Sequence, residues 1–421
     1  MVPSSPSGEP LSTTFGMADV TVRITTAERQ AGEMAGEKAA RIKELFREHG
    51  VVLIDCPCPI VPIEDLEVMG RQLDLQAALA LAHGVLDTGM QRGDGSSTRQ
   101  RPGISTQVRG IHASSLPRRA AWVTPGVVAN PIIEQTVAAC LGDGAFANTF
   151  GTIANFPGSE TQVLHMVRPF LSPSLSAPYG AGSRQDGTWW KTTAAEAAAV
   201  GHPWPYRAHA AMVSFGCDDV THENGASEFW PGSHWDTAPA TTNKPRDPAG
   251  HVAALAAGAE RRRGHSPPIQ LTCPKGSFYI RDDRCWHRGV GNRADRPRHL
   301  ITMGYRSAEV RPDLVIGGTM LRNRSTPEEL EKAATESGWD DTFVRFHPDC
   351  RDALCAEPSR WGVDRNCGFR EDVLIPSIDP RLQLDSQGEV VTEAALPPMP
   401  EELRGVPWVE RVYERGRRAR V

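Results

Sequence analysis

The sequence predicts a mainly β fold with flanking helices, and two observations favour this class. Short apolar or alternating stretches, bounded by Gly, Pro and Asn, are typical of strands. They lie at residues 20–24, 51–54, 151–156, 208–215, 276–282 and 299–306. A helix, a glycine, an apolar strand and a second helix open the series, which indicates helical scaffolding around a sheet.

The first predicted helix covers residues 26–49, where one face is apolar and the other is charged. Its apolar face comprises Ala35, Ala39, Ile42 and Phe46. Gly50 should end this helix, because glycine readily adopts the left-handed conformation found after helix ends. Further helices are expected at residues 62–73, 131–141 and 326–337.

Composition argues against several classes of protein. The net charge of the 421 residues is −5, which argues against general binding to nucleic acids or acidic membranes. No run of about 18 apolar residues occurs, so no membrane span is expected. The nine cysteines are odd in number and form no Cys-x-x-Cys pair. They indicate reduced thiols in a cytoplasmic protein rather than a disulfide framework.

The chain is expected to divide into a leader, one domain and an extension. Residues 1–18 are rich in Ser, Pro and Gly and should be a disordered leader. The domain covers residues 19–311 and carries two insertions, a lid or interaction loop at 168–207 and a second insertion at 236–266. Residues 312–421 form an extension that packs on the domain or makes a subunit contact.

The most informative stretch runs from Cys285 to Arg298. It holds His287, then a turn rich in Gly and Asn, and then Arg298 eleven positions after the histidine. Two antiparallel strands joined in this way can place both side chains at one cavity. An imidazole binds first-row metals, and a guanidinium grips a carboxylate in a two-pronged fork. The pair suits a metal chelated by a small dicarboxylate, although an isolated His and Arg are more often surface residues.

Two upstream motifs complete the pattern. Gln162 and His165 form a Gln-x-x-His pair on a strand predicted after a turn at residues 157–158. Residues 223–234 contain Glu-Asn-Gly, four further residues and Trp-Pro-Gly-Ser-His. The three motifs in this order resemble the phytanoyl-CoA dioxygenase family of iron(II)/2-oxoglutarate oxygenases, and its natural-product members in particular. The resemblance covers roughly residues 35–307.

This resemblance implies a fold and a set of site residues. The fold would be a double-stranded β-helix, an antiparallel core of the jelly-roll or cupin type. His165 and His287 would be iron ligands, and Arg298 would bind the distal carboxylate of 2-oxoglutarate. Gln162 and Thr221 would contact the same cosubstrate. Glu223 and His234 match structural turns of the family, so neither is expected to be catalytic.

The implied activity is the oxidation of an apolar small molecule in specialised metabolism, with iron(II) and 2-oxoglutarate as cofactors. Decarboxylation of 2-oxoglutarate would drive hydrogen abstraction from a C–H bond of the substrate. Trp189 and Trp190 either line the substrate pocket or pack their loop down. A homodimer or a heterodimer with a related oxygenase is a further expectation, and neither nucleic acid nor membrane is an expected partner.

One residue departs from the family pattern. Where the family has Asp, two positions after the first histidine, this chain has Val167. A facial triad consists of two imidazoles and one carboxylate, and valine has no lone pair to donate. Two histidines alone should hold iron more weakly.

Three explanations of Val167 remain open. The chain could be a non-catalytic partner subunit or binding module that pairs with a triad-complete relative. It could be a halogenase-like enzyme in which an anion replaces the carboxylate, although the methyl groups of valine would fill much of that space. Another acid, with Asp186 the nearest candidate, could reach the metal. Arg298 likewise either binds 2-oxoglutarate or is a structural relic, satisfied by Asp295 or a backbone carbonyl.

Overall fold

The computed structural model describes nine segments of the chain. They are residues 15–82, 110–115, 124–143, 145–162, 164–165, 208, 210–235, 267–307 and 396–419. Several predictions concern residues outside these segments. They are the helix at 326–337, the insertions at 168–207 and 236–266, and the side chains of Val167, Asp186, Trp189 and Trp190.

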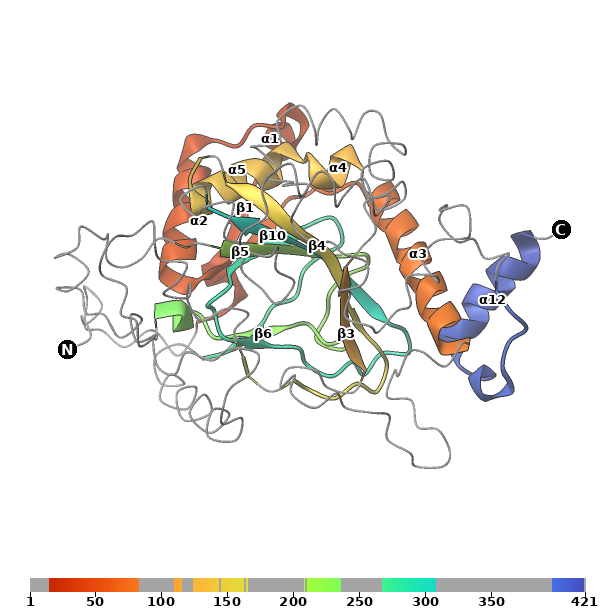
Figure 1. The fold of residues 1–421 in the computed structure, drawn as a ribbon. Helices are drawn as coiled ribbons and strands as arrows, with labels where there is room; N and C mark the ends of the chain where they lie inside the picture. Colours follow the sequence, from red (N-terminus) through yellow and green to blue (C-terminus); the bar gives the residue numbers. More distant parts are fainter. Residues whose placement is uncertain are drawn as a thin grey trace, which may run out of the picture.

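Two sheets form the centre of the fold (Figure 1). Within the described segments, the large sheet has the strand order β1-β2-β8-β5-β10-β4-β3 and the small sheet has the order β7-β6-β9. The strands of the large sheet are β1 (Thr21–Arg23), β2 (Val51–Asp55), β3 (Ile111–Ser115), β4 (Phe146–Asn155), β5 (Ala210–Gly216), β8 (Phe278–Asp282) and β10 (Arg298–Arg306). Those of the small sheet are β6 (Glu228–Phe229), β7 (Ile269–Gln270) and β9 (His287–Arg288).

All neighbouring strands are antiparallel except β1 and β2. This topology confirms the mainly β class with flanking helices and the double-stranded β-helix core.

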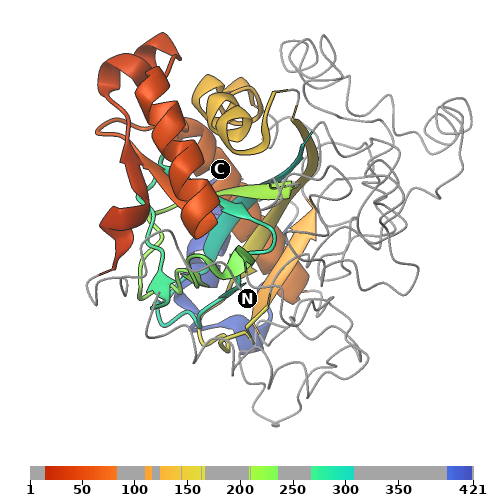
Figure 2. The same cartoon turned by 90° about the vertical axis from the view of Figure 1, so that its left-hand side faces the viewer.

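Helices cover one face and one end of the large sheet. They are α1 (Thr26–Ala31), α2 (Gly36–His49), α3 (Ile63–Ala82), α4 (Pro125–Val128), α5 (Pro131–Leu141) and α12 (Pro407–Ala419), with 3-10 turns η1 (Met17–Val20), η5 (Ser233–Trp235) and η9 (Glu401–Leu403). Figures 1 and 2 place α12 beside α3, away from α1, α2, α4 and α5. None of the helices in the described part of the chain is long and apolar enough to cross a membrane.

Strand alternation separates two apolar layers. On β8, Phe278 and Ile280 pack with the helices in one cluster. Tyr279 and Leu300 belong instead to a cluster with Phe229 of the small sheet. Successive side chains of a strand point to opposite faces, so this second layer fills the space between the two sheets. We call that space the interior.

The segment predicted as one helix over residues 26–49 is two helices. Thr25 caps α1, because its hydroxyl accepts from the Glu28 N–H at 3.2 Å and its own N–H donates to the Glu28 carboxylate at 2.7 Å. Gly32 ends α1 in a left-handed conformation with φ of 66°. The prediction of a single helix is therefore wrong. Gly50 ends α2 with φ of 73°, as expected.

Three further predictions differ from the structure. No strand is predicted between residues 54 and 151, whereas the structure has β3 there, paired with β4 at the end of the described sheet; its apolar alternation is limited to Ile111 and Ala113. The predicted helix at 62–73 is the first part of the longer α3. The strands predicted at 276–282 and 299–306 are not partners, because β5 lies between β8 and β10.

The described end of the chain is a helix rather than the basic tail expected from its arginines. Trp408, Val409 and Val412 of α12 pack with Leu75 and Leu79 of α3 in one buried cluster. Arg411, Arg417 and Arg418 are exposed on this amphipathic helix, whereas Arg415 lies on the side that faces α3. This part of the extension covers α3, and a subunit contact of the extension stays a prediction.

We expect Trp408→Ala to destabilise the protein strongly. Trp408 is 2% exposed and its ring centre lies 5.9 Å from that of Phe156. Truncating a buried tryptophan removes apolar contacts and leaves a cavity, at a cost of about 3–5 kcal/mol. Val68→Ala is the control, because Val68 is 36% exposed on the same α3 and should change stability by less than about 0.5 kcal/mol. Urea denaturation measures both, and similar losses would contradict the packing of α12.

Candidate metal and cosubstrate site

His165 and His287 lie side by side. The His165 N–H donates to the His287 carbonyl at 3.0 Å, and the reverse bond measures 2.8 Å. Their ring centroids are 4.5 Å apart. The chain at His165 therefore runs along the outer edge of β9 in the small sheet, where the described residues of the predicted strand form one antiparallel bridge.

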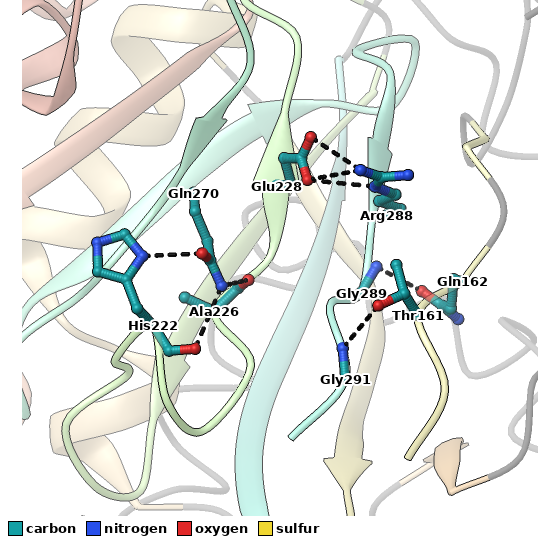
Figure 3. A network of polar contacts seen from close by, with 9 residues as sticks. All are labelled: Thr161, Gln162, His222, Ala226, Glu228, Gln270, Arg288, Gly289 and Gly291. Carbon is teal, nitrogen blue, oxygen red and sulfur yellow. Dashed lines mark hydrogen bonds and ion pairs between the residues drawn. The ribbon is translucent and has the colours of Figure 1, made fainter. Parts of the chain in front are cut away.

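Cross-strand contacts fix the direction in which His287 points. In the pairing of β6 with β9, Glu228 lies opposite Arg288 and Phe229 lies opposite His287. The Arg288 guanidinium contacts the Glu228 carboxylate at 2.9 and 3.2 Å (Figure 3). This ion pair occupies the partly exposed face, so alternation turns His287 and Phe229 into the interior. A slip of one residue would reverse both directions.

His287 is held as a neutral imidazole. Its Nδ1 lies 2.9 Å from the Cys285 carbonyl oxygen, and because a carbonyl only accepts, Nδ1 carries the proton. The lone pair is therefore on Nε2, an arrangement that is common in metal-binding histidines. Burial lowers the pKa of His287 well below its usual range, and the charges of Arg281 and His165 lower it further.

Arg298 begins β10 and is only 2% exposed. Its Nη2 donates to the Gly225 carbonyl at 3.0 Å, and its Nε donates to the Asn224 carbonyl at 3.5 Å. In the described segments its Nη1 has no hydrogen-bond partner. Burial lowers the pKa of Arg298 to about 10, so the guanidinium stays charged near pH 7. One buried donor is thus left for an anion.

The structure distinguishes the two structural partners that were expected for Arg298, a backbone carbonyl and Asp295. Backbone carbonyls do accept two of its donors, as one of the two alternatives requires. Asp295 does not satisfy it, because that carboxylate is exposed and lies 3.9 Å from Arg411 of α12 instead.

A tight turn supplies the carbonyl groups that hold Arg298. The Thr221 N–H donates to Asn224 Oδ1 at 2.8 Å, and Thr221 Oγ1 accepts from the Asn224 N–H at 3.2 Å. Gly225 follows with φ of 82°, and its carbonyl also accepts from the Asn155 amide at 3.5 Å. Thr221 therefore shapes the seat of Arg298, and its contact with the cosubstrate stays a prediction.

Gln162 braces the loop that follows His287. Its side-chain oxygen accepts from the Gly289 N–H at 2.8 Å, and its backbone N–H donates to the Gly289 carbonyl at 2.8 Å (Figure 3). Thr161 makes a similar contact, because its hydroxyl accepts from the Gly291 N–H at 3.1 Å. A contact between Gln162 and the cosubstrate would have to use the amide nitrogen, and it too stays a prediction.

Three residues of the interior were not predicted as site residues from the sequence: Phe229, Tyr279 and Arg281. The Phe229 ring lies 5.8 Å from that of His287 in a stacked arrangement and meets the Tyr279 ring edge-on at 5.6 Å. Burial raises the pKa of Tyr279, so its hydroxyl stays protonated. Arg281 shares a face of β8 with Tyr279. The sequence signal that could have identified Arg281 is a charged residue within the apolar stretch 276–282.

The two residues that were not expected to be catalytic have structural contacts. His234 Nε2 lies 3.0 Å from the Arg47 carbonyl, and its ring packs against Gly50 at the end of α2. Glu223 is exposed, and its carbonyl accepts from the Arg293 N–H at 2.8 Å.

The donor set fits a metal with a bound dicarboxylate in part. His165 and His287 provide two neighbouring nitrogen ligands, and Arg298 provides a buried cationic donor. Among the described residues, however, no group of three or more His, Cys, Asp or Glu side chains could hold a metal. This part of the chain therefore supplies no carboxylate ligand, and Val167 lies outside it.

Comparison with known proteins adds a family match. The family model described as phytanoyl-CoA dioxygenase (PhyH) matches residues 46–300, more than half of the chain.

Several solved structures are also similar. The non-heme alpha ketoglutarate dependent carbocyclase SnoK from nogalamycin biosynthesis is 16% identical, with a TM-score of 0.39 over 66% of this chain and 86% of that one. The epimerase SnoN, in complex with Fe3+, alpha ketoglutarate and nogalamycin RO, is 17% identical, with a TM-score of 0.40 over 69% and 94%. AviO1 from Streptomyces viridochromogenes Tue57 is 15% identical, with a TM-score of 0.40 over 66% and 99%.

Gly225→Ala should destabilise the protein more than Gly405→Ala. Both glycines have positive φ, 82° and 81°, so each alanine meets left-handed strain of about 1–2 kcal/mol. An added Cβ at 225 would also lie 2.4 Å from the Val290 carbonyl oxygen and 2.5 Å from the Asn155 amide, whereas nothing lies within 4 Å at 405. We expect an additional loss of roughly 1–3 kcal/mol for Gly225→Ala in urea denaturation. Equal losses would show that the turn under Arg298 is not tightly packed.

Proposed function

Because the chain belongs to the phytanoyl-CoA dioxygenase (PhyH) family, we propose that it is an iron(II)/2-oxoglutarate-dependent oxygenase-like protein. One observation carries the proposal for this chain. His165 and His287, far apart in sequence, meet on neighbouring backbone segments, and the buried Arg298 leaves its Nη1 for an anion. His287 lies on the small sheet and Arg298 on the large one, and strand alternation turns both side chains into the interior.

Iron with 2-oxoglutarate would supply oxygen activation and hydrogen abstraction at this site. Nε2 of His287 would donate to the metal, with the Cys285 carbonyl fixing the ring orientation. Nη1 of Arg298 would bind the distal carboxylate while the Gly225 carbonyl holds the guanidinium in place. Burial of both residues excludes water and strengthens such charged contacts.

The substrate class and assembly are also part of this proposal. We infer a small molecule of specialised metabolism as substrate, on the resemblance to natural-product members of the family. The lid at 168–207, with Trp189 and Trp190, would border the pocket. The protein would act in the cytoplasm, alone, as a homodimer, or with a triad-complete partner.

A second candidate function is that of a partner subunit or binding module with a degenerate metal site. Val167 favours it, because a valine two positions after His165 offers the metal no ligand. The halogenase-like interpretation and a ligand role for Asp186 depend on residues 167 and 186, which lie outside the described segments.

We expect the purified protein, under anaerobic conditions with iron(II), to bind 2-oxoglutarate and give a weak charge-transfer absorption. Arg298→Met should weaken 2-oxoglutarate binding at least about tenfold, because a charge-assisted hydrogen bond contributes about 1.5–3 kcal/mol. Arg296→Met is the matched control, since Arg296 is exposed and paired with Asp218. His287→Ala should abolish the absorption. If Arg298→Met and Arg296→Met bind 2-oxoglutarate equally well, Arg298 is only structural.

Val167→Asp should restore the missing ligand. We expect iron affinity to rise by at least about tenfold and uncoupled succinate release to increase, because a carboxylate completes the triad. Val68→Asp, on the exposed surface of α3, controls for the added charge.

The outcomes of this substitution separate the two candidate functions. Succinate release by the unmodified protein alone supports an autonomous oxygenase. Release only from Val167→Asp, or only after mixing with a triad-complete relative, supports the partner subunit. No change in iron affinity would show that residue 167 is not at the ligand position.

A further inference from the structure

Arg281 is a buried cation whose Nη1 has no hydrogen-bond partner in the described segments. It lies on β8 and is 4% exposed. The nearest opposite charge is Asp283, whose Oδ1 lies 3.9 Å from Nη1, too far for a hydrogen bond. Burying an arginine without hydrogen bonds is unfavourable, and buried polar groups almost always have partners. Such a residue calls for a ligand that completes its contacts.

Arg281 points into the interior beside the two histidines. It shares a face of β8 with Tyr279, which packs there with Phe229, while Ile280 between them packs with the helices. Its charge is close enough to act on His287, because Arg281 is the largest electrostatic contribution that lowers the pKa of that imidazole.

Arg281 and Arg298 lie at different ends of the interior. Arg281 is opposite Met212 of β5, and Met212 is opposite Gly304 of β10. Arg298 precedes Gly304 by six residues on β10, which corresponds to about 20 Å along the sheet. The Arg298 guanidinium is further held at its own end by the turn carbonyl of Gly225.

We propose that Arg281 binds a carboxylate of the substrate, so that the site takes an organic acid, a class more specific than the apolar small molecule expected from the sequence. The planar guanidinium matches a carboxylate with two parallel donors. The aromatic rings of Phe229 and Tyr279 beside it suit the apolar part of such an acid. The assignment of the acid as substrate rests on the proposed function, whereas the anion site itself does not.

The test uses the full-length, metal-free protein with two pairs of probes, acetate with acetamide and benzoate with benzamide, in calorimetric titrations. We expect at least one carboxylate to bind at least about tenfold more tightly than its amide. Arg281→Met should lower that affinity at least about tenfold and leave 2-oxoglutarate binding within about twofold. Arg298→Met should do the reverse. Arg41→Met, an exposed arginine of α2, should change neither affinity.

Arg281→Lys guards against misfolding of the methionine variant, since it keeps the charge and loses the fork. It should retain circular dichroism and thermal midpoint and still bind the carboxylate more weakly than the wild type.

Four results would overturn the inference. They are no binding of acetate or benzoate, equal carboxylate affinity in the wild type and Arg281→Met, loss of 2-oxoglutarate binding in Arg281→Met, and chloride binding at Arg281 as tightly as the carboxylate. The 2-oxoglutarate titrations are made anaerobically with iron(II), as under the proposed function. Carboxylate binding at Arg281 without any 2-oxoglutarate binding to the iron(II)-loaded protein would refute the proposed function and leave the anion site intact.

Discussion

The pairing of β9 with its two neighbours is the constraint on which the candidate site depends. β6 on one side and the chain at His165 on the other hold this two-residue strand. The Glu228–Arg288 ion pair marks its partly exposed face, so the imidazole of His287 faces the large sheet. Because each strand of the small sheet has only two residues, side-chain contacts such as this ion pair help to fix the register of the sheet. Whether His287 can bind a metal in the interior thus depends on the register of β9.

Arg298 and Arg281 illustrate how the interior tolerates two positive charges. Arg298 uses the carbonyls of a turn shaped by Thr221 and Asn224, which satisfies part of the guanidinium without neutralising it. Among the described residues, the acidic partner of Arg281 is the more distant carboxylate of Asp283. Together they give the space between the sheets a positive potential, which favours anionic ligands and neutral histidines. Burial, with a smaller contribution from the charge of Arg281, lowers the pKa of His287 and keeps its imidazole neutral and available for a metal.

The sequence was sufficient for the fold class and for the proximity of the two histidines, but not for details that depend on packing. The order of the motifs identified His165, His287 and Arg298, because the chemistry of a side chain can be read directly from the sequence. The break at Gly32 was missed because residues 26–31 offer no apolar face of their own that would mark them as a separate helix. β3 was missed because an edge strand is held by backbone pairing rather than by apolar alternation. Arg281 was missed because the alternation of a strand shows which residues share a face, not which of them lack partners.

Asp74 of α3 links the far end of the chain to the strand that begins with Arg298. Its carboxylate lies 3.1 Å from Nε2 of His299 and 3.8 Å from Nη2 of Arg415 in α12. A chain shortened before residue 396 would expose the apolar side of α3 to water. It would also remove Arg415, one of these two partners of Asp74. Cleavage or partner binding near α12 would then change the surroundings of His299 at the start of β10. Through Asp74, the C-terminal helix thus contributes to the surroundings of His299, the residue next to Arg298.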